Sequence, residues 1–196
     1  GWHVPGNQRC RGRDASVEAD YSQSAFFYAM AGMGSDLTVT GMNPDSRQGD
    51  KVILDYAAQL DRPGEVTLDV RECPDLVPAL AARAALRGGE ITRIVGAGRL
   101  RIKESDRLQS TTSVLNAMGA EVLEEPESLT IRGKAGLRGG VTVDAWNDHR
   151  IAMMAAAAAT RCELPVTITG AQCVRKSYPA FWQDYARLGG ALEETE

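Results

Sequence analysis

The strongest constraint on this chain of 196 residues is a pattern of strand, helix, strand and helix that occurs three times along it. Val, Ile and Thr with Gly as punctuation indicate the strands, and apolar periodicity indicates the helices. The expected strands are 16–20, 37–41, 67–70, 90–95, 141–143 and 165–170, and the expected helices are 21–31, 50–60, 76–86, 105–118, 151–160 and 178–188. Units this short cannot bury an apolar face alone, so we expect them to stack.

The units differ in how they end. After its second helix, the second unit continues into two further expected strands, 121–125 and 128–132, joined by a turn at Pro126-Glu127. The third unit stops without such a pair. The sequence therefore predicts an α/β (α+β) domain of three repeated units whose last unit is incomplete. We expect its closing strands to come from a chain segment before residue 1.

Composition narrows the class of protein. Hydrophobic residues make up 43% and charged residues 24%, which is ordinary for a globular domain, and the net charge of -4 argues against a nucleic-acid partner. Two histidines, and four cysteines without CxxC spacing, give no sign of a metal site and favour free thiols in the cytoplasm. The longest apolar run, 151–159, is too short to cross a membrane, and no signal peptide is present. The chain begins with Gly rather than Met, so we expect a chain processed or excised from a longer one.

In each unit an acid stands where the first strand meets the first helix, at Asp20, Asp75 and Asp148. Ligands gather at such junctions in α/β proteins. An acid at a helix start is also an ordinary N-cap. Both interpretations stay open for Asp20 and Asp75.

Basic residues gather at helix starts too. Lys103 and Arg107 are four residues apart, and Arg107 falls in a first helical turn, where the helix dipole favours anions over cations. A bound anion would relieve their repulsion. The alternative is a solvated charged loop paired with Glu104 and Asp106.

Two further junctions repeat this arrangement. Arg150 opens an Ala-rich helix, next to His149, and Arg175-Lys176 precedes the last expected helix. Each could be surface charge when considered alone. Three such junctions, together with one carboxylate, indicate a site for an anionic and phosphorylated substrate.

Six segments, in order, resemble the signatures of the EPSP synthase (3-phosphoshikimate 1-carboxyvinyltransferase) family. The RxKESDR-like segment and the DHRxAM-like segment are the most specific of them. The six are Val17–Ser22, Gln48–Asp50, Pro74–Pro78, Arg101–Arg107, Asn147–Met153 and Cys173–Pro179. The resemblance covers nearly everything from residue 17 on. It implies that 17–196 is the carboxy-terminal domain and that 1–16 is the segment arriving from a missing amino-terminal domain.

The resemblance implies an enzyme with two similar domains, each of three βαβαββ-type units around a pseudo-threefold axis, and an active site between them. Such enzymes transfer the enolpyruvyl group of phosphoenolpyruvate to the 5-hydroxyl of shikimate 3-phosphate and release phosphate, in aromatic amino acid biosynthesis, without a metal or organic cofactor. The Lys-Ser and Ser-Ser-Gln motifs of the family's other domain are absent here. We therefore expect about half of an active site and little or no turnover by this chain alone.

The same resemblance implies residue roles. Asp75 would accept the hydroxyl proton and Glu104 would help to protonate the methylene of phosphoenolpyruvate. Asp75 and Lys103 would bind shikimate 3-phosphate. Phosphoenolpyruvate would be held by Arg107, Arg150 and Lys176, with His149 orienting the site.

One position and two alternatives stay open. Arg99 stands where some members of the family have an Asn that contacts shikimate 3-phosphate, so no role is transferred to it. A UDP-N-acetylglucosamine enolpyruvyl transferase has the same fold and chemistry, but its motifs differ at the KESDR and DHR positions. An isolated, non-catalytic ligand-binding domain is the second alternative.

Overall fold

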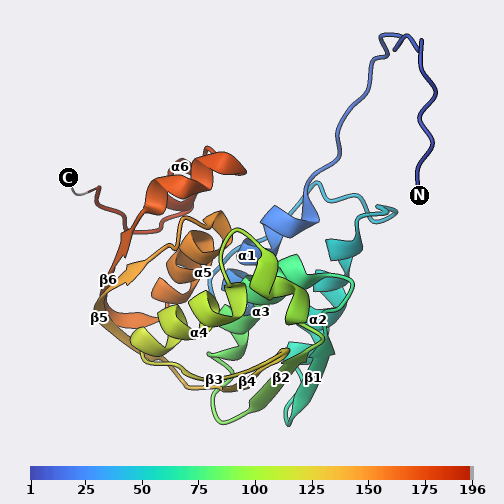
Figure 1. Ribbon diagram of the computed structural model, residues 1–196. Helices are drawn as coiled ribbons and strands as arrows, with labels where there is room; N and C mark the ends of the chain where they lie inside the picture. Colours follow the sequence, from blue (N-terminus) through green and yellow to red (C-terminus); the bar gives the residue numbers. More distant parts are fainter. Residues whose placement is uncertain (195–196) are drawn as a thin grey trace.

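The computed structural model describes residues 1–194 and contains two sheets with helices between and beside them (Figure 1). The helices are α1 (Tyr21–Gly32), α2 (Ile53–Leu60), α3 (Val77–Ala84), α4 (Arg107–Ala117), α5 (His149–Ala159) and α6 (Phe181–Arg187). The strands are β1 (Val66–Asp69), β2 (Ile91–Val95), β3 (Glu121–Glu125), β4 (Ser128–Arg132), β5 (Leu137–Asp144) and β6 (Cys162–Thr169). Short 3-10 helices are η1 (Gly49–Val52), η2 (Pro74–Leu76), η3 (Gly98–Ile102) and η4 (Ala171–Lys176).

The second unit, 66–132, has the complete βαβαββ order that the repeat predicts. Its four strands form one sheet in the order β1-β2-β4-β3, with β1 and β2 parallel and the β3–β4 hairpin antiparallel to β2. Glu125 pairs with Ser128, so the hairpin turns at Pro126-Glu127 as expected. In β1, Val66 and Leu68 are buried while their neighbours face solvent, which is the alternation of a sheet with one covered face.

The third unit, 137–187, contains β5 and β6 as a parallel two-stranded sheet, with α5 crossing between them. No closing strand pair follows β6 within residues 137–194. The prediction of an incomplete last unit is confirmed for these residues. The source of further strands stays a prediction.

The first unit has the expected helices but not the expected strands. Residues 16–20 and 37–41 form no strand in the described chain, so both strand predictions are wrong. Residues 16–20 are fully exposed up to the start of α1. A segment becomes a strand only when it forms ladder hydrogen bonds with a neighbouring strand, and β-propensity alone does not provide that neighbour.

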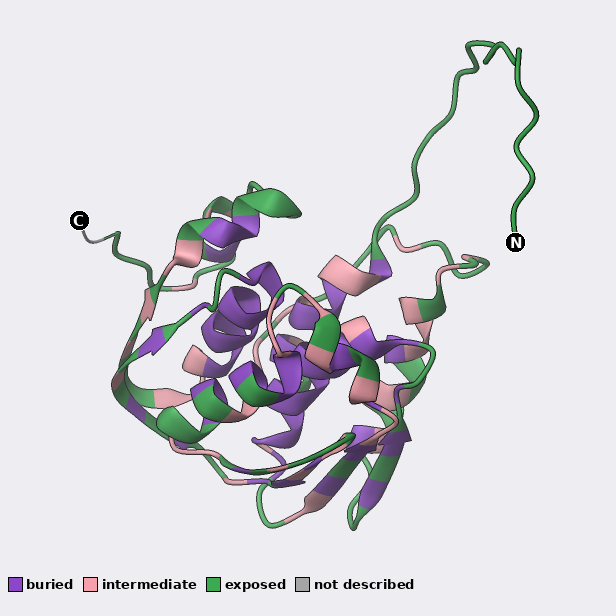
Figure 2. Cartoon of the chain, in the orientation of Figure 1, coloured by how far each residue is buried: buried purple, intermediate pink, exposed green. Residues whose placement is uncertain are grey.

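The core lies where the first helices of the three units, α1, α3 and α5, pack on one another (Figure 2). Small side chains make this possible, because Ala79, Ala81 and Ala82 of α3 and Ala155 to Ala158 of α5 are buried. Residues 1–17 are exposed and lead away from this body (Figure 1), whereas Glu18 accepts hydrogen bonds from Asn43, Ser46 and Gln48. Within residues 1–194, no helix has the length and hydropathy needed to cross a lipid bilayer.

Candidate active site

The second and third units turn from strand to helix through the same backbone hydrogen bonds. Cys73 N donates to Val70 O at 3.0 Å in the second unit, and Asp148 N donates to Ala145 O at 2.9 Å in the third. Cys73 and Asp148 are therefore equivalent positions. Two residues further on, Asp75 of the second unit is equivalent to Arg150 of the third.

This equivalence corrects the prediction that Asp20, Asp75 and Asp148 occupy matching places. Asp20 caps α1 by accepting from Ser22 N and Gln23 N, and Asp148 caps α5 by accepting from Arg150 N at 3.0 Å. Asp75 makes no capping bond and follows Pro74 inside the first turn of η2. The capping interpretation is confirmed for Asp20 and is wrong for Asp75.

Asp75 is instead the meeting point of three cations. Its Oδ1 lies 3.1 Å from Lys103 Nζ and 2.8 Å from Arg107 Nη1, and its Oδ2 lies 3.6 Å from Arg150 Nη2. Burial raises the pKa of this carboxyl, but Arg150, Lys103 and Arg107 outweigh burial and hold the pKa below its usual range. About a third of the Asp75 side chain stays exposed, so a ligand can reach it.

Arg107 is the buried centre of the cluster, with 1% of its side chain exposed. It donates to Asp148 Oδ2 at 2.7 Å, to Asp75 Oδ1 at 2.8 Å and to Glu104 Oε2 at 2.5 Å. The alternative of a solvated charged loop is wrong for Arg107. Lys103 lies outside α4, because Asp106 caps this helix and Arg107 is its first residue. The two cations meet at Asp75 instead.

Arg101 fixes the loop that carries Lys103 and Glu104, a role that the sequence analysis missed. Its Nη1 donates to Asp106 Oδ2 at 2.9 Å and to Glu124 Oε1 at 2.8 Å, and its other nitrogens donate to two carbonyls of the β3–β4 hairpin. The acidic run of the hairpin was visible in the sequence, but no local spacing connects it to residue 101.

His149 and Lys176 lie beside the cluster rather than inside it. Lys176 is exposed, and its Nζ donates to Asn147 O and Asn147 Oδ1, each at 2.8 Å. His149 is buried, and its Nδ1 lies 4.0 Å from Asp148 Oδ1. Burial and the nearby Arg150 cation lower the pKa of His149. Arg99, for which no role was predicted, is exposed.

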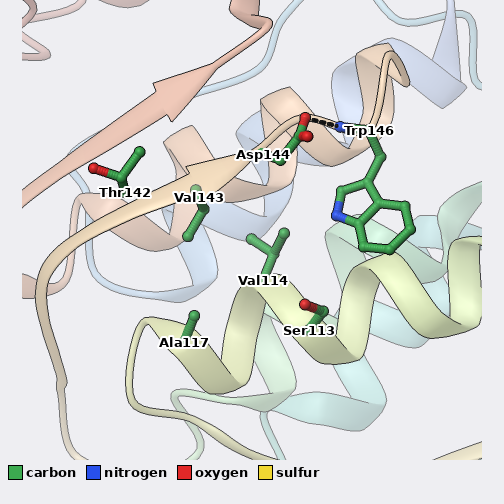
Figure 3. A pocket seen from close by; sticks show the side chains of 7 residues that line it. All are labelled: Ser113, Val114, Ala117, Thr142, Val143, Asp144 and Trp146. Atoms are coloured by element: carbon green, nitrogen blue, oxygen red, sulfur yellow. Dashed lines mark hydrogen bonds between the residues drawn. The ribbon is translucent and has the colours of Figure 1, made fainter.

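A hollow of about 290 Å³ lies between α4 and β5 and contains none of the predicted site residues (Figure 3). Trp146 stands over it from the turn that leads to Asp148, and Trp146 N donates to Asp144 Oδ1 at 2.7 Å. Val114 and Ala117 of α4 and Val143 of β5 give it apolar walls. We place the candidate site at the ion-pair cluster, because the hollow brings no cation together with a reactive carboxylate.

The described residues contain no cluster of side chains suited to a metal ion. No three His, Cys, Asp or Glu side chains within 1–194 are arranged to hold a metal ion. The four cysteines, Cys10, Cys73, Cys162 and Cys173, are free thiols.

Comparison with known proteins identifies the family of the chain. The model of the family described as EPSP synthase (3-phosphoshikimate 1-carboxyvinyltransferase) matches residues 1–185. The 3-phosphoshikimate 1-carboxyvinyltransferases of Clostridium kluyveri and Clostridium acetobutylicum are each 46% identical over 97% of this chain, which covers 48% and 47% of their lengths. An EPSP synthase structure from Acinetobacter baumannii superposes with a TM-score of 0.67 at 26% identity, over 92% of this chain and 48% of that one.

The chain thus spans about half the length of the curated relatives it matches. The match of the family model extends over most of the chain, and the relatives match almost all of it. The fold, with its complete βαβαββ second unit, agrees with the solved relative. The chain belongs to the EPSP synthase (3-phosphoshikimate 1-carboxyvinyltransferase) family.

Proposed function

We propose that this chain is the carboxy-terminal half of an enzyme that transfers the enolpyruvyl group of phosphoenolpyruvate to the 5-hydroxyl of shikimate 3-phosphate and releases phosphate. The observation that carries the proposal is the convergence of Lys103, Arg107 and Arg150 on the single carboxylate of Asp75. Both substrates are anions with phosphate groups. Arginine forks suit carboxylate and phosphate recognition.

Unpartnered groups in the cluster and beside it support an anion site. Within residues 1–194, Arg150 Nε and His149 Nδ1 are buried and have no hydrogen-bond partner. An unsatisfied buried polar group costs about 1–3 kcal/mol. A bound anion that accepts a hydrogen bond from Arg150 would remove part of this cost.

In the proposed reaction Asp75 is the general base that accepts the proton of the 5-hydroxyl. Its lowered pKa makes it a weak base while three cations surround it. Phosphoenolpyruvate carries a carboxylate and a phosphate that would take over Arg107 and Arg150. The departure of these partners would raise the pKa of Asp75 toward the value that proton transfer needs.

The remaining roles follow the positions in the cluster. Glu104 keeps 43% of its side chain exposed and would help to protonate the methylene carbon. Lys103 would bind shikimate 3-phosphate together with Asp75. Arg107, Arg150 and Lys176 would hold phosphoenolpyruvate and stabilise negative charge in the transition state. His149 would orient the site, and no metal or cofactor takes part.

The proposed partner is the other half of such an enzyme, carrying the remaining substrate contacts. Domain closure would complete the site, which one half cannot do alone. We place this enzyme in the cytoplasm, because the free thiols of the described chain are typical of a reducing compartment.

The test is phosphate release from shikimate 3-phosphate and phosphoenolpyruvate. The chain is assayed alone and after mixing or fusion with the amino-terminal half of the Clostridium kluyveri relative. Activity only in the combined enzyme supports the proposal. Combined halves that are folded but inactive would favour the alternative of a non-catalytic ligand-binding domain. Replacing shikimate 3-phosphate by UDP-N-acetylglucosamine tests the sister activity, which we expect to be absent.

A further inference from the structure

Asp148 is buried more completely than any other carboxylate of the cluster, with 0% of its side chain exposed. One oxygen, Oδ1, accepts a hydrogen bond from Arg150 N at 3.0 Å, which is the usual hydrogen bond of an N-cap. The other oxygen, Oδ2, accepts from Arg107 Nε at 2.7 Å and from Ser105 Oγ at 3.0 Å. The carboxylate therefore does more than begin a helix.

The backbone turn itself does not require this carboxylate. In the second unit the equivalent position is Cys73, which makes no side-chain capping bond, and η2 and α3 still follow. The turn alone therefore does not explain the acid at position 148. What distinguishes Asp148 from Cys73 is its contact with Arg107, the first residue of α4.

The geometry of Arg107 shows what Asp148 controls. Asp148 binds the Nε and Nη2 edge of the guanidinium, at 2.7 and 3.3 Å. A guanidinium is planar, so fixing one edge fixes the direction of the other nitrogen. That nitrogen, Nη1, is the one that reaches Asp75. Burial raises the pKa of Asp148, but the bonds from Arg107 outweigh burial and keep the carboxyl ionised.

Asp148 also supplies charge that stays in place when a substrate binds. Asp75 and Glu104 are partly exposed and would exchange Arg107 for substrate groups during the reaction. Arg107 begins α4, where the helix dipole disfavours a cation. A permanent buried partner keeps Arg107 in position through that exchange.

We propose that Asp148 is a positioning residue for this reaction, which fixes the guanidinium of Arg107 from inside the protein so that its outer edge meets the carboxylate or phosphate of phosphoenolpyruvate. The inference rests on the proposed function. Ser105 is the secondary partner, holding the carboxylate through its hydroxyl.

The test uses Asp148→Asn in the combined two-half enzyme. Asn is as good an N-cap as Asp, so α5 keeps its start, but the amide cannot accept from both Arg107 and Arg150 with a full charge. We expect the KM for phosphoenolpyruvate to rise about 10- to 100-fold, the range for a lost hydrogen bond to a charged group. The KM for shikimate 3-phosphate should change less than about threefold. A merely structural role would instead reduce the amount of active enzyme and leave both KM values unchanged.

Asp61→Asn is the matched control. Asp61 also pairs with a buried arginine, Arg83, but in the last turn of α3, away from the cluster. This variant should leave both KM values unchanged. A double-mutant cycle then asks whether Asp148 acts through Arg107. Asp148→Asn should add little to the loss already caused by Arg107→Lys, whereas full additivity overturns the proposal.

The remaining outcomes also support or overturn the proposal. If Asp148→Asn does not fold, Ser105→Ala should raise the KM for phosphoenolpyruvate alone by about two- to fivefold, as expected for a weaker neutral contact. An unchanged KM in that variant overturns the proposal. If the unmutated combined enzyme is inactive, the proposed function fails and this role fails with it. An active enzyme with normal phosphoenolpyruvate kinetics in Asp148→Asn removes the positioning role alone.

Discussion

The second and third units follow the same backbone path from strand to helix, yet they bring opposite charges to the same place. The turn after β1 carries Cys73 at the capping position and Asp75 two residues later. The turn after β5 carries Asp148 at the capping position and Arg150 two residues later. Asp75 and Arg150 then meet, with Oδ2 and Nη2 3.6 Å apart.

The difference shows that the repeat determines where a side chain lies but not which chemical group it carries. The repeat supplies position, because the second residue after each capping position faces the same cluster. It leaves the chemistry free, since one unit contributes a carboxylate there and the other a guanidinium. An internal repeat can in this way build an asymmetric site from equivalent backbone.

The largest effect should follow from removing the charge that distinguishes the second unit. Asp75→Asn in the combined enzyme should lower kcat by about 10²- to 10⁴-fold, the usual range for general base catalysis. Phosphate release under saturating substrates measures this. The Asp61→Asn enzyme is the control for the loss of a carboxylate elsewhere. A kcat within about threefold of the unmutated enzyme would remove Asp75 from the mechanism.

The sequence predicted the second unit better than the first, for a physical reason. The β3–β4 hairpin was predicted with the observed bounds, because it carries its own turn and its own partner strand. The strands expected at 16–20 and 37–41 carried similar local signals but have no partner in the described chain. Local propensity predicts an extended segment, and only a neighbour makes it a strand.

The site was predictable in part for a related reason. Helix starts could be located from the sequence, so the gathering of Lys103, Arg107 and Arg150 was expected. The second oxygen of Asp148 and the reach of Arg101 were not, because side-chain direction across 41 and 23 residues has no local pattern. The roles in catalysis that the resemblance implied stay predictions until turnover is measured.

A second difference between the units lies just beyond their first helices, where each has an arginine. Arg87 of the second unit is buried and donates to Leu60 O, Arg62 O, Gly64 O, Ile91 O and Thr92 Oγ1. Arg161 of the third unit has a buried Nε without a partner in the described residues. Lysine has three donors, so Arg87→Lys leaves buried carbonyls unpaired and should cost about 2–4 kcal/mol of unfolding free energy.

Urea denaturation of the chain measures this difference, with Arg161→Lys as the matched variant. We expect Arg161→Lys to cost less than about 1 kcal/mol, because few bonds are lost. Equal losses in the two variants would mean that the bonds of Arg87 do not stabilise the second unit more than Arg161 stabilises the third.

A glycine follows the second strand of each unit, which is β2 in the second unit and β6 in the third, and the two glycines differ in how closely other atoms approach them. Gly96 and Gly170 both have left-handed φ angles, of 73° and 69°. A Cβ on Gly96 would lie 2.7 Å from Asp69 Oδ1, whereas the nearest atoms to a Cβ on Gly170 lie 3.8 Å away. Gly170→Ala should cost about 1–2 kcal/mol from the left-handed backbone alone.

Gly96→Ala should cost more than Gly170→Ala, because Asp69 must also move and lose its bond to Arg71 N. Urea denaturation of both variants gives the order. If Gly170→Ala is the more damaging of the two, the close approach to Asp69 is not a constraint on the second unit.

The smallest effect concerns the residue between the capping position and the site, which is Pro74 in the second unit and His149 in the third. Burial and Arg150 lower the pKa of His149 below the 6.5 of an unfolded chain. Below about pH 6.5 the unfolded chain therefore binds the proton more readily than the folded chain. The stability that neutral His149 allows is complete above that pH and is lost as the pH falls through the window down to the lowered folded pKa.

His149→Gln should accordingly reduce the difference in unfolding free energy between pH 7.5 and pH 5.5. Urea denaturation at the two pH values measures it, and His3→Gln is the matched control, because His3 lies in the exposed segment before α1 and is the other histidine of the chain. The second unit has no titratable group at this position, so the pH response should belong to the third unit. If the difference in unfolding free energy between the two pH values is unchanged in His149→Gln, the pH response comes from another group. The turns of the second and third units would then differ only in the charges of Asp75 and Arg150.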